Sequence, residues 1–345
     1  MKNEKLLTRD EFREQVFARD NHKCVVCGNP AQDAHHILER RLWDDGGYYL
    51  SNGASVCGEH HIQCEQTTIS VEQIRDFAGI TNAMIPDHFY RDVTYDKWGN
   101  IITPSGRFKG ELFSDESVQK ILHSGGVLHE FKPYVKYPRT HHVPWSPGIT
   151  DDDRVMKSME HFEGQRVVVT VKKDGENTNL YRDYFHARSI DSRNHPSRNW
   201  VKNFWAKMSH EIPEQWRVCG ENLFARHSIA YDDLPTYFMG FSIWDSTNTC
   251  LSWDDTQLWF ELLGIHSVPV LYDGIYDEKI IKSLWDQSKW NTMEGYVLRT
   301  ADSFKYGDFR KNVAKFVRPN HVQPSAHHWQ RGAVIPNGTS MTHMY

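Results

Sequence analysis

The chain has 345 residues, of which 25% are charged, and its formal net charge is −5. This length predicts two domains with a hydrophobic core each, and the charge balance excludes a strongly basic surface over the whole protein, which leaves room only for a local nucleic-acid groove. No apolar run approaches the roughly 18 residues of a membrane span, so we expect no membrane partner. Because no secretory signal precedes them, the six cysteines are expected as metal ligands or free thiols in a cytoplasmic protein.

The first part of the chain is expected to combine helices with one hairpin. Residues 8–20 begin with a Thr-x-x-Glu capping box and carry apolar residues at helical spacing, which predicts a helix. Residues 69–79 predict a second helix. The segment 90–110 predicts a hairpin with Gly99 at its turn, and a short helix is expected at 115–123.

A proline-rich stretch divides the sequence. KPYVKYPRTHHVPWSPG contains four prolines in 17 residues, and proline interrupts both helices and sheets. We therefore expect an N-terminal module at 1–85, a connecting hairpin and helix at 86–132, and a second domain at 133–345.

The second domain alternates short β-like runs with helical patterns. The predicted strands are 167–171, 177–184, 216–219, 237–244, 293–299 and 313–318. The predicted helices are 150–162, 198–209, 253–263 and 278–286. This alternation predicts an α+β domain built on antiparallel sheets with flanking helices.

Two close pairs of metal-binding residue types lie in the first 64 residues. Cys24 and Cys27 form one pair, and Cys57 and His60 form the other. Four nitrogen and sulfur ligands at such spacing are typical of a tetrahedral structural zinc site. The alternative is a set of scattered buried thiols, which so short a segment disfavours.

Further histidines accompany this predicted zinc site. His35 and His36 are adjacent, Asn52 follows, and His61 lies beside the proposed ligand His60. The group resembles the HNH endonuclease family, whose ββα-metal motif is often braced by a zinc knuckle, over about residues 10–80. The resemblance implies that His35 and His61 hold a catalytic divalent ion. It also implies that His36 is the general base that activates water and that Asn52 orients this base. A zinc-braced binding module that does not cut is the alternative.

The segment VTVKKDGENTNLY, residues 169–181, begins as a strand, is interrupted by Lys172-x-Asp174-Gly175, and then resumes its strand pattern. Four further segments follow in order, so that the five together span about 150 residues: WRVCGENLF, TYFMGFSIWD, MEGYVLR and VAKFVRP. Together they resemble motifs I, III, IIIa, IV and V of the covalent nucleotidyltransferases, the superfamily of ATP-dependent DNA and RNA ligases and capping enzymes.

The resemblance implies a lysine nucleophile. Lys172 would attack the α-phosphorus of ATP and form a lysyl-AMP phosphoramidate. Only the neutral amine is a nucleophile, so such a site must lower the pKa of this lysine by burial, neighbouring cations or bound metal. Lys173 alternates to the other face of the strand and is expected to be solvated.

The later motifs supply groups for phosphate and metal. Lys315 and Arg318 would neutralise charge on the α-phosphate, and Glu294 would lie near the catalytic Mg²⁺ or Mn²⁺. The two basic residues of motif V are usually separated by one residue, whereas two lie between Lys315 and Arg318. This departure puts the role of Arg318 in doubt.

Other matched positions would bind the nucleotide and the RNA. Glu221 would accept hydrogen bonds from the ribose hydroxyls and Phe241 would stack on adenine, with Phe238 as the competing choice. Asn177 and Arg188 match positions of phage-type RNA ligases that seal nicks, of which the first touches the RNA end. Since only 27 residues follow Arg318, we expect none of the OB domain that DNA ligases and capping enzymes need.

These motifs predict an ATP-dependent RNA ligase that repairs nicked or broken RNA, either duplex or tRNA-like, fused to the HNH-like zinc module. Its expected cofactors are ATP, Mg²⁺ or Mn²⁺, and structural Zn²⁺. Two alternatives stay open: a bifunctional enzyme that cuts and reseals nucleic acid, and a nucleic-acid-binding adaptor with both sites decayed. Intact Lys172, Glu221, Glu294 and Lys315 disfavour the adaptor.

Overall fold

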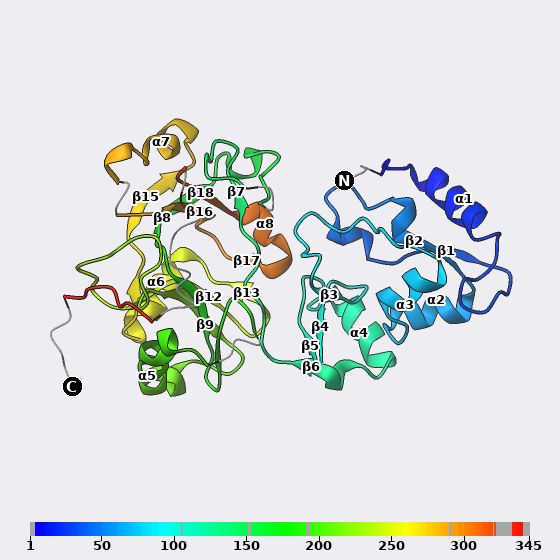
Figure 1. Ribbon diagram of the computed structural model, residues 1–345, viewed down its shortest axis with the longest axis horizontal. Coiled ribbons are helices and arrows are strands. Elements are labelled where there is room, and N and C mark those ends of the chain that lie inside the picture. Colours follow the sequence, from blue (N-terminus) through cyan, green and yellow to red (C-terminus); the bar gives the residue numbers. More distant parts are fainter. Residues whose placement is uncertain are drawn as a thin grey trace. The chain divides into compact units, whose positions relative to one another are not determined.

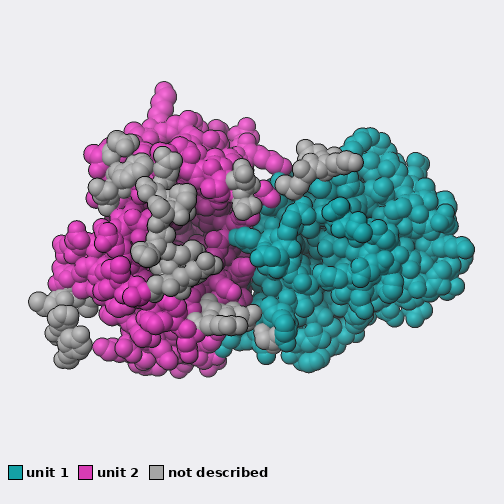
Figure 2. All heavy atoms as spheres, viewed as in Figure 1, with its two compact units in different colours: residues 1–135 teal, residues 136–345 magenta. Residues whose placement is uncertain are grey.

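The computed structural model describes residues 4–104, 106–150, 153–190, 194–289, 292–319, 321 and 333–340. The chain divides into two compact units, Met1–Val135 and Lys136–Tyr345 (Figure 2). Among the described residues, no helix is both long enough and apolar enough to cross a membrane.

A ββα arrangement forms the first part of unit 1 (Figure 1). Its elements are α1 (Arg9–Arg19), β1 (Asp33–His36), β2 (Gly53–Val56), α2 (Gly58–Glu65) and α3 (Val71–Phe77). The capping box predicted for α1 is present, with Thr8 and Glu11 each bonded to the other's backbone N–H. Helix α1 lies against β2 at Gly53, where a Cβ would come within 2.4 Å of Val16. Glycine is therefore required for this close approach.

The predicted hairpin and helix complete unit 1. A small sheet has the order β3-β4-β5-β6, and its elements with the following helix are β3 (Thr94–Tyr95), β4 (Ile101–Thr103), β5 (Gly106–Phe108), α4 (Glu116–Ser124) and β6 (Phe131–Lys132). The turn between β3 and β4 is held by the buried carboxylate of Asp96, which accepts N–H bonds from Trp98 at 2.9 Å and Asn100 at 3.0 Å. This turn fixes the backbone of Lys97.

Unit 2 is an α+β domain, as expected, and its described residues form two sheets. The five-stranded sheet has the order β15-β8-β16-β18-β7, formed by β7 (His141–His142), β8 (Arg166–Lys172), β15 (Val270–Ile275), β16 (Gly295–Thr300) and β18 (Val313–Val317). The other sheet has the order β10-β9-β11-β12-β13-β17, and β14 pairs with β12. Its strands are β9 (Glu176–Leu180), β10 (Phe185–Ala187), β11 (Arg217–Asn222), β12 (Phe238–Trp244), β13 (Thr249–Cys250), β14 (His266–Ser267) and β17 (Phe304–Lys305). The helices are α5 (Asn199–Met208), α6 (Trp253–Leu262), α7 (Glu278–Ser283) and α8 (Phe309–Asn312).

The strands on either side of the Asp-Gly turn do not pair with each other. Strand β8 belongs to the five-stranded sheet, whereas β9 belongs to the other sheet, where it lies between β10 and β11. The interruption seen in the sequence is therefore a crossing between two sheets rather than a hairpin turn. Lys172, the last residue of β8, consequently lies where the chain leaves one sheet for the other.

The predicted helix at 150–162 is wrong over the described residues 153–162, which are irregular apart from a 3-10 turn at Glu160–Phe162. The backbone of this segment bonds to His142 of β7, through His142 N–H to Arg154 O at 2.6 Å and Met156 N–H to His142 O at 2.8 Å. Met156, Met159 and Phe162 are buried in the core of the five-stranded sheet. Their spacing of three imitates a helical face, although it arises from packing under a sheet.

Candidate active site

Three strands of the five-stranded sheet converge at Lys172. Gly295, at the start of β16, lies opposite Lys172 on one side and Val317 of β18 on the other. The Glu294 N–H donates to Lys172 O at 3.0 Å, and the Arg318 N–H donates to Glu294 O at 3.0 Å. The Lys172 side chain is 25% exposed and its Nζ donates a short hydrogen bond to the Glu294 carboxylate. Backbone pairing thus places lysine, glutamate and arginine of three motifs together.

Carboxylates control the charge of Lys172. Burial disfavours its ammonium, but nearby carboxylates, chiefly that of Glu294, outweigh burial, so the pKa of Lys172 is raised. Burial also raises the pKa of Glu221 to about 8, against the opposing effect of Lys172. In this state Lys172 is therefore protonated and is not yet a nucleophile.

Asp174, two residues after Lys172, is held in place by hydrogen bonds. Its carboxylate accepts the Ile229 N–H at 2.8 Å, and its own N–H donates to the Tyr231 hydroxyl at 2.9 Å. His321 Nε2 lies 3.4 Å from both Asp174 Oδ1 and Glu294 Oε1. Ligand atoms of Asp174, Glu294 and His321 all lie within 4.8 Å of one another, as metal ligands do. His321 and Tyr231 carried no motif signal in the sequence.

Lys173 is less exposed to solvent than expected. It is half-buried, and its Nζ lies 4.5 Å from the centre of the Tyr231 ring. Burial lowers the pKa of Lys173. Its side chain does differ from that of Lys172 in its partners, since Lys172 pairs with Glu294.

The motif V residues occupy different environments. Lys315 on β18 lies opposite Val297 and its Nζ is 3.2 Å from Asp153 Oδ1. Burial lowers the pKa of Lys315, with Asp153 opposing this effect. Arg318 is 4% exposed, and burial lowers its pKa while Asp174 raises it. The pairing of Lys315 with Asp153 joins residues 162 positions apart, which no motif spacing could predict.

The other expected nucleotide-binding residues lie on the second sheet or beside it. Phe241 is half-buried on β12 and its ring packs against Tyr137, whereas Phe238 is fully buried among core residues. Asn177 lies opposite Glu221 in the β9–β11 pairing. Arg188 is exposed just after β10. Of the two phenylalanines, only Phe241 offers an accessible ring for stacking.

The four predicted zinc ligands come together in unit 1. Cys24 and Cys27 lie in the turn between the bridged residues Lys23 and Pro30, while Cys57 precedes α2 and His60 is in its first turn. His60 Nδ1 lies 3.1 Å from Cys57 Sγ and 3.6 Å from Cys24 Sγ. All four ligand atoms lie within 4.8 Å of one another, a spacing that suits tetrahedral zinc with ligand bonds of roughly 2.0–2.3 Å.

The HNH-like residues also form a cluster, on β1 and α2. His61 Nε2 lies 3.3 Å from Glu65 Oε1, and His35 Nδ1 lies 3.5 Å from the same oxygen. Glu65 was not predicted, although its position one helical turn after His61 is the available signal. His36 stacks on Phe12 with ring centres 4.5 Å apart. Burial lowers the pKa of His36 to about 4, so its imidazole is neutral at neutral pH.

Two residues outside this cluster form hydrogen bonds that fix its surroundings. Asn52, fully buried, accepts the Leu38 N–H at 2.9 Å and donates to Leu38 O at 3.0 Å, which fixes the loop after β1. Lys97 Nζ donates to His36 O at 2.8 Å and lies 3.0 Å from Glu65 Oε1. Its ammonium would thus compete with a metal cation for Glu65. A cavity of 360 Å³ opens beside these groups.

The RNA ligase family model matches residues 165–317. This region contains β8, β16 and β18 and therefore Lys172, Glu294 and Lys315. The match supports an RNA ligase function and an enzyme of the ligase class, in agreement with the expectation from the motifs. No curated protein matches the chain in the sequence comparison.

Solved structures with weak similarity include RNA ligases. An RNA ligase mutant from Naegleria gruberi with ATP and Mn is 19% identical over 46% of this chain and 52% of its own, with a TM-score of 0.35. The same ligase with PPi is 17% identical over 84% of this chain and 75% of its own, with a TM-score of 0.40. An archaeal ATP-dependent RNA ligase is 14% identical over 54% of this chain and 48% of its own, with a TM-score of 0.35. This chain thus spans about half the length of the first and the third.

We predict that the protein binds about one zinc ion per chain, because four ligands complete a structural site. Cys27→Ser should lose this zinc and destabilise unit 1, since metal binding contributes directly to folding. Cys64→Ala is the control, because Cys64 is a buried thiol of the same unit outside the cluster. Elemental analysis by plasma emission checks the prediction. Equal zinc content in Cys27→Ser and the wild type would contradict it.

We predict that Glu221→Gln raises the melting temperature. The folded protein holds a proton on Glu221 up to about pH 8, whereas the unfolded chain releases it near its ordinary value of 4.5. A raised folded pKa means that stability is lost as pH rises between these two values. The gain from glutamine should therefore be absent below about pH 4.5, grow to about 3 °C near pH 8, and then level off.

Thermal unfolding of wild type, Glu221→Gln and the exposed control Glu214→Gln across this pH range provides the measurement. A gain that did not change with pH, or one shared by the control, would argue against a perturbed Glu221.

Proposed function

We propose that this chain is an ATP-dependent RNA ligase that acts through a lysyl-AMP intermediate. The observation that carries the proposal is the position of Lys172, which lies where the chain leaves one sheet for the other and donates a hydrogen bond to Glu294. Strand β16 lies between the strand of Lys172 and the strand of Lys315. The family match over 165–317 supports the same reaction class.

The first step follows from these positions. Nζ of neutral Lys172 attacks the α-phosphorus of ATP, a P–N bond forms, and the P–O bond to the departing pyrophosphate breaks. Lys172 must first lose a proton, and the Glu294 carboxylate that already accepts its hydrogen bond is the nearest acceptor. Lys315 would stabilise the charge that develops on the α-phosphate.

A divalent cation fits the acidic side of this site. Asp174, Glu294 and His321 offer two carboxylates and an imidazole within 4.8 Å of one another, and the carboxylate oxygens are ligands that suit Mg²⁺ and Mn²⁺. Bound there, the cation would withdraw carboxylate charge from Lys172 and so favour its neutral amine.

The later steps use RNA as substrate. AMP is transferred from Lys172 to the RNA 5′-phosphate, and attack by a 3′-hydroxyl then forms the phosphodiester bond and releases AMP. We propose that Phe241 stacks on adenine, that Glu221 contacts the ribose, and that Asn177, Arg188 and Arg318 contact the nucleotide or the RNA end. The half-buried ring of Phe241 supports its assignment over Phe238.

A second activity is proposed for unit 1, as an HNH-like zinc module that cuts nucleic acid. The observation that favours it is the convergence of His35, His61 and Glu65 within 4.8 Å, with His36 on the same strand as His35. A dication at this cluster would hold the scissile phosphate, and His36 would accept a proton from water. The adjacent Lys97 must yield Glu65 to the metal for this reaction to proceed.

We predict that Lys172→Ala abolishes formation of lysyl-AMP, while Lys173→Ala retains most of it. The two lysines are adjacent, and burial lowers the pKa of Lys173, whereas at Lys172 nearby carboxylates outweigh burial and raise the pKa. Lys173 is therefore the competing candidate for the nucleophile, and the two alanine variants distinguish between the two lysines. Lys172→Arg should be as inactive as alanine, because guanidinium stays protonated. Label from [α-³²P]ATP retained on denatured protein measures the step, and the reverse pattern would move the nucleophile to Lys173.

We predict that His36→Ala reduces metal-dependent strand cleavage by about 10²-fold or more, since it removes the general base. Lys172 lies in the other unit, so lysyl-AMP formation should be unchanged. His123→Ala, an exposed histidine on α4, is the matched control. Cleavage of end-labelled RNA and DNA with Mg²⁺ or Mn²⁺ is the measurement. If the wild type cleaves neither, unit 1 is a binding module and the nuclease proposal fails.

A further inference from the structure

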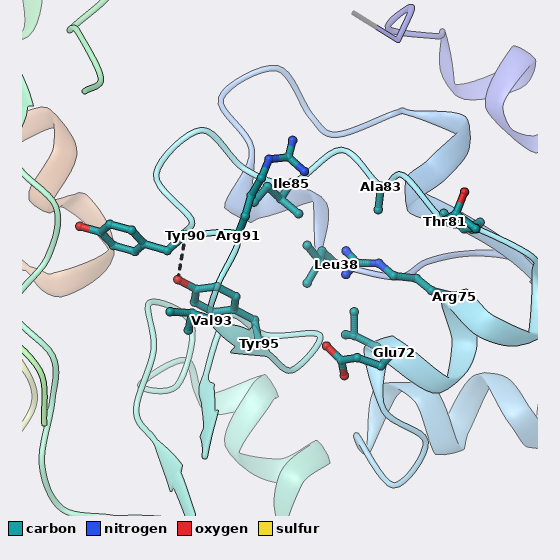
Figure 3. Close-up of a pocket in the computed structure, with 12 residues that line it drawn as sticks. Leu38, Glu72, Arg75, Thr81, Ala83, Ile85, Tyr90, Arg91, Val93 and Tyr95 are labelled. Atoms are coloured by element: carbon teal, nitrogen blue, oxygen red, sulfur yellow. Dashed lines mark hydrogen bonds between the residues drawn. The ribbon is translucent and has the colours of Figure 1, made fainter. Parts of the chain in front are cut away.

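Unit 1 contains a second pocket, distinct from the histidine cluster. It has a volume of 190 Å³ and lies between α3 and the segment that leads into β3 (Figure 3). Its lining includes the apolar side chains of Leu38 and Ile85. The charged side chains that line it are Arg75, Arg91 and Glu72. None of these residues has a role in the two reactions proposed above.

Arg75 is the unusual group in this pocket. It comes from the last turn of α3, and its guanidinium points toward the centre of the pocket (Figure 3). Its Nε and Nη2 are buried and have no hydrogen-bond acceptor. A buried charged donor without an acceptor costs folding free energy, so native proteins rarely retain one unless another group satisfies it.

The surrounding charges favour an anion as that group. Burial lowers the pKa of Arg75, which Glu72 opposes and Arg91 reinforces. Arg91 and Glu72 are both exposed, so water screens them more than it screens Arg75. The pocket therefore carries two cations against one anion. Arg75 presents a planar array of donors that matches the oxygens of a phosphate.

Hydroxyl groups extend this donor set. Tyr95 accepts the Tyr90 N–H at 3.2 Å through its hydroxyl oxygen, which leaves the hydroxyl hydrogen to donate (Figure 3). Thr81 lines the same pocket. The pocket volume of 190 Å³ is several times the roughly 30 Å³ share of one water, and so admits a group of several heavy atoms.

We propose that this pocket binds a phosphate group of RNA through Arg75, with Arg91 at its mouth. The inference rests on the proposed RNA ligase function for the identity of the ligand. It adds a positioning site within unit 1, because phosphate contacts hold a nucleic acid in place without reading its sequence. The phosphate has two sources in such a substrate, an internal diester of the strand or a terminal monoester.

The test measures RNA binding by the full-length protein. Fluorescein-labelled single-stranded oligoribonucleotides, one with a 5′-phosphate and one with a 5′-hydroxyl, are titrated over a series of salt concentrations. The variants are Arg75→Met, which keeps the apolar stem, and Lys120→Met, which removes one exposed charge of unit 1 outside the pocket. We expect Arg75→Met to bind about tenfold more weakly at low salt, with a salt slope smaller by about 0.7. Lys120→Met should bind as the wild type does.

The two RNAs separate the two sources of phosphate. Equal loss on both identifies a strand diester, whereas loss on the 5′-phosphorylated RNA alone, with competition by inorganic phosphate, identifies a terminal monoester. Either result supports the site. Unchanged binding of both RNAs by Arg75→Met overturns it, and so does equal weakening by Lys120→Met, because that indicates a diffuse charge effect.

Stability distinguishes a binding role from a structural one. Arg75→Met should melt no lower than the wild type, since it removes a buried donor that lacks an acceptor. A lower melting temperature together with unchanged RNA binding assigns Arg75 to the fold alone and refutes the proposal. Lysyl-AMP formation is measured in the same preparations. Its absence from the wild type would refute the ligase proposal, whereas its persistence in Arg75→Met beside weakened RNA binding locates the defect in this pocket.

Discussion

The contact between the Lys172 ammonium and the Glu294 carboxylate is the interaction on which unit 2 depends. It joins the last residue of β8 to the residue before β16, and backbone hydrogen bonds at 3.0 Å lock the same two residues together. Because β18 pairs with the other side of β16, Lys315 and Arg318 are brought to the same end of the sheet. Sheet pairing alone thus assembles groups that are more than 140 residues apart in the chain.

This contact also keeps Lys172 protonated, and the protonated amine is not a nucleophile. Carboxylates raise the pKa of Lys172, while burial keeps a proton on Glu221 at neutral pH. The Glu294 carboxylate holds the proton on Lys172, so the neutral amine forms only when that negative charge is drawn away. A divalent cation bound with ATP would supply the opposing charge, so ligand binding and activation of the lysine are expected to be coupled.

Unit 1 shows the same principle in a different fold. Lys97 lies beside Glu65 of the histidine cluster, where its ammonium holds a position that a metal could share. Arg75 presents the opposite imbalance, since two of its buried nitrogen atoms have no acceptor. The Lys97 ammonium is already compensated by Glu65 and Glu39. The Arg75 guanidinium is not, and a buried charge without full compensation marks a place where a ligand would lower the free energy.

Local sequence determined the features that depend on neighbouring residues. Three such features could be predicted, because each is set by spacing within a few residues. They are the capping box of α1, the strands flanking Lys172-x-Asp-Gly and the two pairs of zinc-type ligands. The tertiary structure decided the rest. It turned the expected helix at 150–162 into an irregular segment bonded to β7, since Met156, Met159 and Phe162 gain more from burial under the sheet than from helical bonds. It also brought His321 to Asp174, Asp153 to Lys315 and Lys97 to Glu65. Such contacts join distant segments, and only the packing of sheets and turns determines which of these segments meet.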